Sequence, residues 1–200
     1  MYSRRTGLVL GFHGCDSEVR DRVLSEKGVL LKPSENAYDW LGHGIYFWEN
    51  NHHRALQFAR ELKENPPRGK ENLIKEPAVL GAVLDLGYCL DLLDSKYLGV
   101  LRKSYEILCE NVNQASITMP KNIFSQNGDL LRRNLDCAVI ETTHRINKDL
   151  GKPQYDSVRG VFFEGNDLYE NAGFKEKNHI QIAIRNQNCI KGFFAPRDLD

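Results

Sequence analysis

The stretch Gly42-His43-Gly44-Ile45-Tyr46-Phe47 decides how this chain is interpreted, because glycines frame a run of strand-forming residues. Upstream lies Gly11-Phe12-His13-Gly14-Cys15, and the residues between the two stretches have room for one helix. Near the C-terminus, His179-Ile180-Gln181-Ile182-Ala183-Ile184-Arg185 alternates apolar and polar positions, which is typical of a half-buried strand. The three stretches together predict strands that each present a polar or aromatic side chain.

The composition indicates one soluble globular domain. The chain has 200 residues, of which 41% are hydrophobic and 27% charged. Its 27 basic and 27 acidic residues cancel, which argues against a strong sequence-independent grip on nucleic acid, although a local basic patch would not appear in the sum. Five cysteines without framework spacing favour reduced thiols, and no apolar run has the length of a membrane span. We therefore expect a cytoplasmic protein with no membrane partner.

Hydrophobic periodicity and turn signals predict the order of the elements. Helices are expected from Asp16 or Ser17 to about residue 27, from Asn50 or Asn51 to 64, over 97–111 and over 129–150. Strands are expected over 8–12, 44–48, 78–86, 88–93, 158–163, 180–184 and 190–194. The mixture lacks regular βαβ alternation and therefore favours an α+β fold. The sequence also has no Gly-x-Gly-x-x-Gly and no phosphate loop, so any NAD site is not of the Rossmann kind.

The order of these motifs resembles the His-Tyr-Glu class of ADP-ribosyltransferases, which includes the catalytic domains of poly(ADP-ribose) polymerases and their bacterial mono-ADP-ribosylating relatives. The run Val79–Gly87 is similar to the central strand of that family, and the likeness covers most of residues 8–93 and 158–195. The resemblance implies a single catalytic domain over residues 1–200, with two packed, mostly antiparallel sheets that form an NAD cleft. Residues 95–155 would be a helical insertion in that fold.

The resemblance also implies NAD as a substrate, with His13, Tyr46 and Gln181 as the catalytic triad. His13 would bond a ribose hydroxyl on the adenosine side. The backbone of Gly14 would pair with the nicotinamide carboxamide, since a residue without a Cβ permits close approach to a flat ligand. Tyr46 would face the nicotinamide ring, and Phe58 would stack on its other side. The helical phase of Phe58 also suits plain core packing.

The sequence departs from the family at two of these positions. Cys15, expected among the NAD-binding residues, stands where Ser or Thr is usual, and a thiol forms only a weak hydrogen bond. Gln181 stands where the polymerases have Glu, so it can hydrogen-bond the ribose but brings no negative charge. Single-unit transfer is therefore expected rather than polymer building. Glu164 and Glu176 are the alternatives for the third position, and Gln181 can also be an ordinary polar residue of a strand.

The remaining polar clusters carry less information. Adjacent His52 and His53 fit no standard zinc spacing, with or without His13 and Cys15, so no metal site is expected. A Cys15 nucleophile paired with a histidine also lacks any supporting signature.

Two segments can contact an acceptor. Arg132 and Arg133, with Arg145 and Lys148, can form a basic helix face for nucleic acid or an acidic partner, or simply a solvated face. Residues 172–177 correspond to the acceptor-facing loop of many transferases.

The predicted function is NAD-dependent mono-ADP-ribosyl transfer to a protein or nucleic acid. A compact transferase of this style suggests a toxin or effector, for which a neutralising antitoxin or immunity partner is expected. One alternative is a catalytically weak module that binds NAD or an ADP-ribosylated partner. Another is an enzyme similar to the tRNA 2′-phosphotransferases, which share the NAD site.

Overall fold

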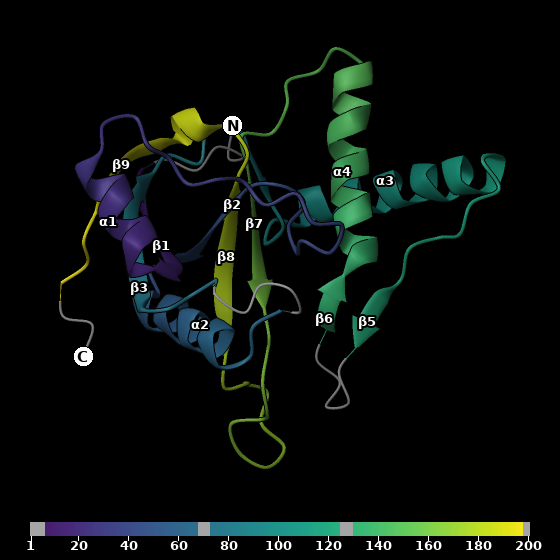
Figure 1. The fold of residues 1–200 in the computed structure, drawn as a ribbon. Helices are drawn as coiled ribbons and strands as arrows, with labels where there is room; N and C mark the ends of the chain where they lie inside the picture. Colours follow the sequence, from purple (N-terminus) through teal and green to yellow (C-terminus); the bar gives the residue numbers. More distant parts are fainter. Residues whose placement is uncertain (1–6, 68–72, 125–129, 198–200) are drawn as a thin grey trace.

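The computed structural model describes residues 7–67, 73–124 and 130–197, and this part of the chain is α+β, as predicted (Figure 1). The helices are α1 (Ser17–Ser25), α2 (His52–Glu64), α3 (Ser95–Gln114) and α4 (Asn134–Asp149), with a short 3-10 turn at Gln187–Cys189. The strands are β1 (Val9–Asp16), β2 (Ile45–Glu49), β3 (Pro77–Leu84), β4 (Cys89–Asp91), β5 (Asn122–Phe124), β6 (Leu130–Arg133), β7 (Ser157–Phe162), β8 (His179–Ile184) and β9 (Ile190–Phe194).

The expected pair of packed sheets is wrong, because one seven-stranded sheet runs in the order β4-β7-β8-β2-β1-β3-β9. Its strands are antiparallel except for the β4–β7 pair, and β5 and β6 form a separate two-stranded sheet. The junction between its halves is narrow, since β1 and β2 pair only at Gly11 with Glu49 and at Phe12 with Trp48. This junction makes one sheet where the family resemblance implied two.

The two faces of the sheet are covered by different helices. Ile45 and Phe47 of β2 are buried in a cluster that includes Val23 of α1. Tyr46, which points the other way by strand alternation, packs with a cluster that includes Ile140 of α4. In Figure 1, α3 and α4 lie together beside the sheet, away from α1 and α2. Helices α3 and α4, which belong to the expected insertion, thus pack on the face on which Tyr46 lies, and α2 packs on the same face at Trp48.

The N-terminal caps of α1 and α2 follow the sequence prediction. Asp16 accepts a hydrogen bond from the backbone N–H of Glu18 at 2.9 Å, and Asn51 accepts one from Arg54 at 2.9 Å. Asp16 is the last residue of β1, and Asn51 lies between β2 and α2, so both caps lie where the chain turns from strand to helix. Of the helices in the described ranges, none is long and apolar enough to cross a lipid bilayer.

The predicted helix over 129–150 begins later than expected. Residues 130–133 form β6, which pairs with β5, and α4 starts at Asn134, while residue 129 lies outside the described part. Asn122 of β5 explains the start, because its Oδ1 accepts hydrogen bonds from the backbone N–H groups of Leu135 and Asp136 at 2.9 and 3.3 Å. The helix is thus capped by a residue distant in the sequence, which periodicity within the helix does not reveal.

Candidate functional site

A pocket of about 470 Å³ lies over β2 and β8, bordered by α2 and by residues 34–40. His13, Tyr46, Phe58 and Gln181 all line it, so four of the predicted site residues meet there. The other described lining residues are Ser34, Asn36, Tyr38, Asp39, Trp40, Trp48, Arg54, Glu61, Leu62, Pro67, Leu73 and Glu164.

His13 lies where β1 and β2 part. Its Nδ1 is 2.7 Å from the carbonyl oxygen of Tyr46. Since a carbonyl only accepts, Nδ1 carries the proton and Nε2 is left as an acceptor. Burial lowers the pKa of the imidazole, despite the opposing effect of the Tyr46 carbonyl, so the neutral ring is favoured. A neutral Nε2 that accepts a hydrogen bond suits a ligand hydroxyl group.

Tyr46 holds the loop that precedes its own strand. Its hydroxyl donates to the carbonyl oxygen of Gly42 at 2.6 Å and accepts from the backbone N–H of Leu41 at 2.7 Å. Gly42 has φ +72°, a left-handed conformation that favours glycine. The hydroxyl is therefore used within the protein, and what Tyr46 offers to the pocket is its aromatic ring.

Gln181 lies in the middle of β8, between Trp48 of β2 and Gly160 of β7. Its residue is 8% exposed, although the side chain lines the pocket. The alternation predicted for this strand agrees, since Ile182 and Ile184 are buried in the cluster on the α1 side. The structure places Gln181 on the same pocket as His13 and Tyr46.

Phe58, Gly14 and Cys15 differ in their relation to the pocket. The Phe58 ring lines it and lies 4.9 Å from the Trp48 ring. A side chain at Gly14 would collide with the carbonyl oxygen of Ala55, so this glycine lets α2 pack on β1. Cys15 is buried in the core on the α1 side, and burial raises the pKa of its thiol to about 11. Neither Gly14 nor Cys15 is among the described residues that line the pocket.

A charged pair contributes to the lining of the pocket, and it consists of Arg54, which the sequence did not predict, and Glu164, an alternative for the third position. Arg54, which is 6% exposed, donates from Nη2 to Oε2 of Glu164 at 3.0 Å and lies 3.5 Å from Glu61. Glu164 lies just after β7 and lines the pocket, whereas Glu176 binds the backbone N–H of Asn166 at 3.1 Å and is not among the described lining residues. Glu164 is one of the predicted alternatives for the third position, whereas no local pattern marks Arg54.

The charges of the described lining residues are mostly negative. They comprise the carboxylates of Asp39, Glu61 and Glu164 and the guanidinium of Arg54. Asp39 accepts hydrogen bonds from the Ser34 hydroxyl at 2.8 Å and from the backbone N–H of Asn36 at 2.9 Å, so it also shapes the loop. Glu61 also pairs with Lys177 at 2.8 Å, which offsets part of this excess. The remaining excess of carboxylates favours a cationic ligand or a transition state that becomes positive.

An ion pair connects α4 to the loop that Tyr46 holds. Glu141 of α4 accepts from Arg185 at 2.5 Å and from the backbone N–H of His43 at 2.8 Å. Arg185 also donates to the carbonyl oxygen of His43 at 2.9 Å. The hydrogen bonds with Arg185 and His43 outweigh burial and lower the pKa of Glu141. Helix α4 is therefore attached to His43, which follows the pocket-lining segment 34–40 in the chain.

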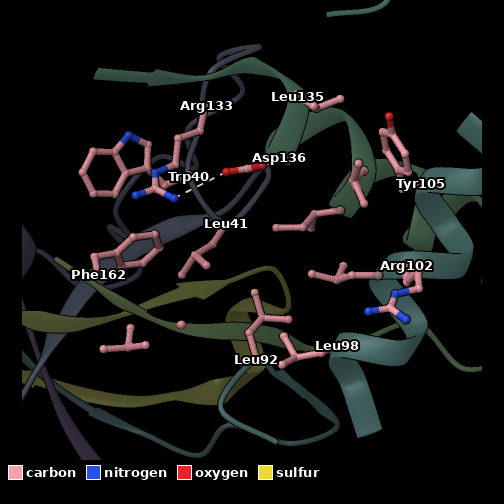
Figure 2. A pocket seen from close by; sticks show the side chains of 15 residues that line it. Trp40, Leu41, Leu92, Leu98, Arg102, Tyr105, Arg133, Leu135, Asp136 and Phe162 are labelled. Carbon is pink, nitrogen blue, oxygen red and sulfur yellow. Dashed lines mark hydrogen bonds and ion pairs between the residues drawn. The ribbon is translucent and has the colours of Figure 1, made fainter. Parts of the chain in front are cut away.

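A second pocket, of about 490 Å³, lies between α3, α4 and β7 (Figure 2). Trp40 and Phe162 form one side of it, with Arg133 stacked on both rings at 4.6 and 4.8 Å. Leu98, Arg102 and Tyr105 of α3 form the opposite side. Trp40 lines both pockets, so the two cavities are neighbours.

Among the described residues, no three His, Cys, Asp or Glu side chains are grouped so that they could hold a metal ion. His52 and His53 stack on each other with ring centroids 4.0 Å apart. The Cys137 Sγ, like that of Cys15, is buried, and its burial raises the thiol pKa to about 11. These thiols are not poised as nucleophiles.

The comparisons with known proteins add one relative. The chain is 25% identical over 195 residues to an uncharacterized protein of Methanocaldococcus jannaschii, and the alignment covers 90% of this chain and 83% of the relative. No protein-family model matches the chain. No solved structure matches it either. The relative is itself uncharacterized, so it assigns no activity to this chain.

Proposed function

We propose that the protein is an NAD-dependent mono-ADP-ribosyltransferase. The observation that carries the proposal is the meeting of His13, Tyr46, Phe58 and Gln181 in one pocket. These residues come from β1, β2, α2 and β8, and the order of their motifs resembles one transferase class. Their convergence is what that resemblance requires of a shared NAD site.

The pocket chemistry suits cleavage of the nicotinamide–ribose bond. The bond between ribose C1′ and the nicotinamide nitrogen breaks, and nicotinamide leaves with the electron pair. An acceptor atom then bonds to C1′ and releases its proton to solvent. Positive charge builds on the ribose ring as the bond breaks, as in glycoside cleavage. The carboxylates of Glu61 and Glu164 supply negative charge near such a ring.

The residues have distinct roles in this proposal. The Nε2 of His13 accepts a hydrogen bond from a ribose hydroxyl, and the Tyr46 ring faces the nicotinamide. Gln181 orients the ribose through its amide without adding charge. Glu164 contributes the carboxylate that Gln181 lacks, and its ion pair with Arg54 holds that carboxylate in place. A site without a carboxylate on β8 favours transfer of a single unit.

One specific observation favours a second candidate, an NAD-binding module with little turnover. Gln181 occupies the position where a carboxylate would activate an acceptor hydroxyl, and Glu164 is already paired with Arg54. Such a module would bind NAD in the same pocket and release nicotinamide slowly, with no labelled acceptor.

The test is incubation of the purified protein with NAD labelled in its adenosine part, alone and with cell extract treated with nuclease or protease. Nicotinamide release and label on protein or nucleic acid are followed together. With the natural protein we expect nicotinamide release and a labelled acceptor, and both should be lost in His13→Ala. His53→Ala should change neither, because this exposed histidine is not among the described residues that line the pocket. NAD binding without release would support the second candidate. Absence of both would refute the NAD site.

A further inference from the structure

The second pocket has features of a binding site for a planar group. Its volume is about 490 Å³, and its walls come from α3, α4, β7 and the loop that carries Trp40 (Figure 2). The Trp40 and Phe162 rings lie 4.9 Å apart, and the Arg133 guanidinium covers both. Tyr105 lies on the other side of the cavity, where it is 43% exposed. Aromatic rings on two sides of a cavity suit a flat guest.

The charge of this pocket is opposite to that of the first. Its described lining includes the guanidinium groups of Arg102 and Arg133 and the carboxylate of Asp136. Arg133 lies 3.4 Å from Asp136, which is long for a charged hydrogen bond. Nearby, Arg132 stacks on the Tyr38 ring at 5.3 Å, and Tyr38 borders the first pocket. Arginines therefore extend from one pocket to the edge of the other.

Part of the pocket wall is apolar and open to solvent. Leu98 is 51% exposed and Val161 44% exposed, and both line the cavity. Exposed apolar side chains grouped around a concave site mark a surface that a ligand covers. Aromatic rings, apolar side chains and arginines together are the composition with which proteins bind single-stranded nucleic acid, since bases stack and phosphates pair with arginine.

We propose that this pocket holds a base of a single-stranded nucleic acid. We infer that this strand is the ADP-ribose acceptor, and this part of the inference rests on the proposed function. The base stacks beside Tyr105, and the flanking phosphates contact Arg102 and Arg132. The carboxylates of the first pocket suit the cationic nicotinamide ring, whereas Arg102 and Arg132 suit the phosphates of the strand. Trp40 forms a wall of both sites.

The test measures binding of fluorescein-labelled single-stranded RNA and DNA 12-mers by anisotropy, without NAD. We expect salt-dependent binding of at least one of them. Tyr105→Ala should weaken it about tenfold or more through lost stacking. Arg102→Ala should weaken it and reduce the slope of log affinity against log salt by about 0.7. Lys103→Ala is the matched control, because this neighbouring exposed cation on α3 is not among the described lining residues.

The outcomes separate this inference from the proposed function. Binding that Tyr105→Ala weakens and Lys103→Ala leaves within about twofold supports the site, whichever strand type binds. No binding of either oligonucleotide, or equal losses in all three variants, overturns it. Label found on protein rather than on nucleic acid would overturn the assignment of the strand as acceptor, while leaving the transferase activity established. Oligonucleotide binding without nicotinamide release would instead refute the transferase and keep the nucleic-acid site. Thermal unfolding of each variant checks that these exposed substitutions leave the fold intact.

Discussion

The Nδ1 of His13 lies 2.7 Å from the carbonyl oxygen of Tyr46, so the first two predicted triad residues are joined by a hydrogen bond. It forms one residue beyond the last pair that β1 and β2 share, Phe12 with Trp48. The imidazole thus bridges the strands where their ladder ends and turns Nε2 into the proton acceptor of the ring. Because the strand pairing stops at Phe12, the carbonyl group of Tyr46 is available to the His13 ring.

Tyr46→Phe should destabilise the loop that contains Leu41 and Gly42, while an aromatic ring still lines the pocket. The change removes one donor to Gly42 and one acceptor for Leu41, at about 1 to 3 kcal/mol of unfolding free energy. We also expect weaker NAD binding, because residues 34–40 border the pocket. Urea unfolding and NAD titration measure both effects. Tyr169→Phe, at a residue that is 59% exposed, is the control, and an equal loss there would contradict the interpretation.

Arg54→Met should leave the Glu164 carboxylate without its partner. The expected loss is about 3 kcal/mol of unfolding free energy, the lower end for a buried pair because the Glu164 side chain is 21% exposed. Adding Glu164→Gln to that variant should recover part of the loss, since it removes the unpaired charge. Denaturant unfolding of the single and double variants tests this coupling. Arg60→Met, on the exposed side of α2, should change stability little, and additive losses would show that the pair is not coupled.

Glu141→Ala should detach α4 from the loop that contains His43. Two charged hydrogen bonds with Arg185 and one with the His43 N–H are lost, for roughly 3 kcal/mol. Because this loop adjoins the first pocket, the Michaelis constant for NAD should rise more than the turnover number falls. Steady-state nicotinamide release measures the split. Glu106→Ala, at an exposed position of α3, is the control, and an unchanged Michaelis constant would separate the ion pair from the site.

Gln181→Glu adds a carboxylate to the pocket. If Gln181 faces the ribose, negative charge at this position should stabilise the cationic transition state and change the rate or the product length. Nicotinamide release and gel analysis of labelled product measure both. Identical rate and product would indicate that the third functional residue lies elsewhere, with Glu164 as the first substitute because it lines the same pocket.

Acid should destabilise the protein through two buried histidines. Burial lowers the pKa of His144 and of His179 from 6.5 to about 4. The unfolded chain binds these protons as the pH falls below 6.5 while the folded chain resists them, so unfolding free energy decreases from about pH 6.5 to about pH 4, by up to roughly 3 kcal/mol for each group. Urea unfolding across this range measures the slope. His179→Gln should reduce the slope of unfolding free energy against pH, whereas His53→Gln, at an exposed position, should not. If His179→Gln has the same slope as the natural protein, burial of this histidine is not the cause.

Local patterns in the sequence predicted the elements of the site well. Alternation along β2 and β8 placed Tyr46 and Gln181 opposite the isoleucines, and the clusters of the core have that arrangement. Residue type and position also narrowed the caps to Asp16 or Ser17 and to Asn50 or Asn51, and the structure has Asp16 and Asn51. Such features depend on residues a few positions apart, so the sequence contains what is needed to find them.

Other features depend on contacts between distant segments. The start of α4 is set by Asn122, and the pairing of Arg54 with Glu164 spans 110 residues. The single sheet follows from two residue pairs between β1 and β2.

The sequence by itself therefore determined which residues are candidates for the site and which face of each strand they occupy. Only the tertiary structure decided that His13, Tyr46, Phe58 and Gln181 share one pocket and that a second pocket adjoins it at Trp40. Periodicity fixes the direction of a side chain relative to its own element. Packing and hydrogen bonds between elements determine which residues that side chain contacts, and no local sequence pattern predicts those contacts.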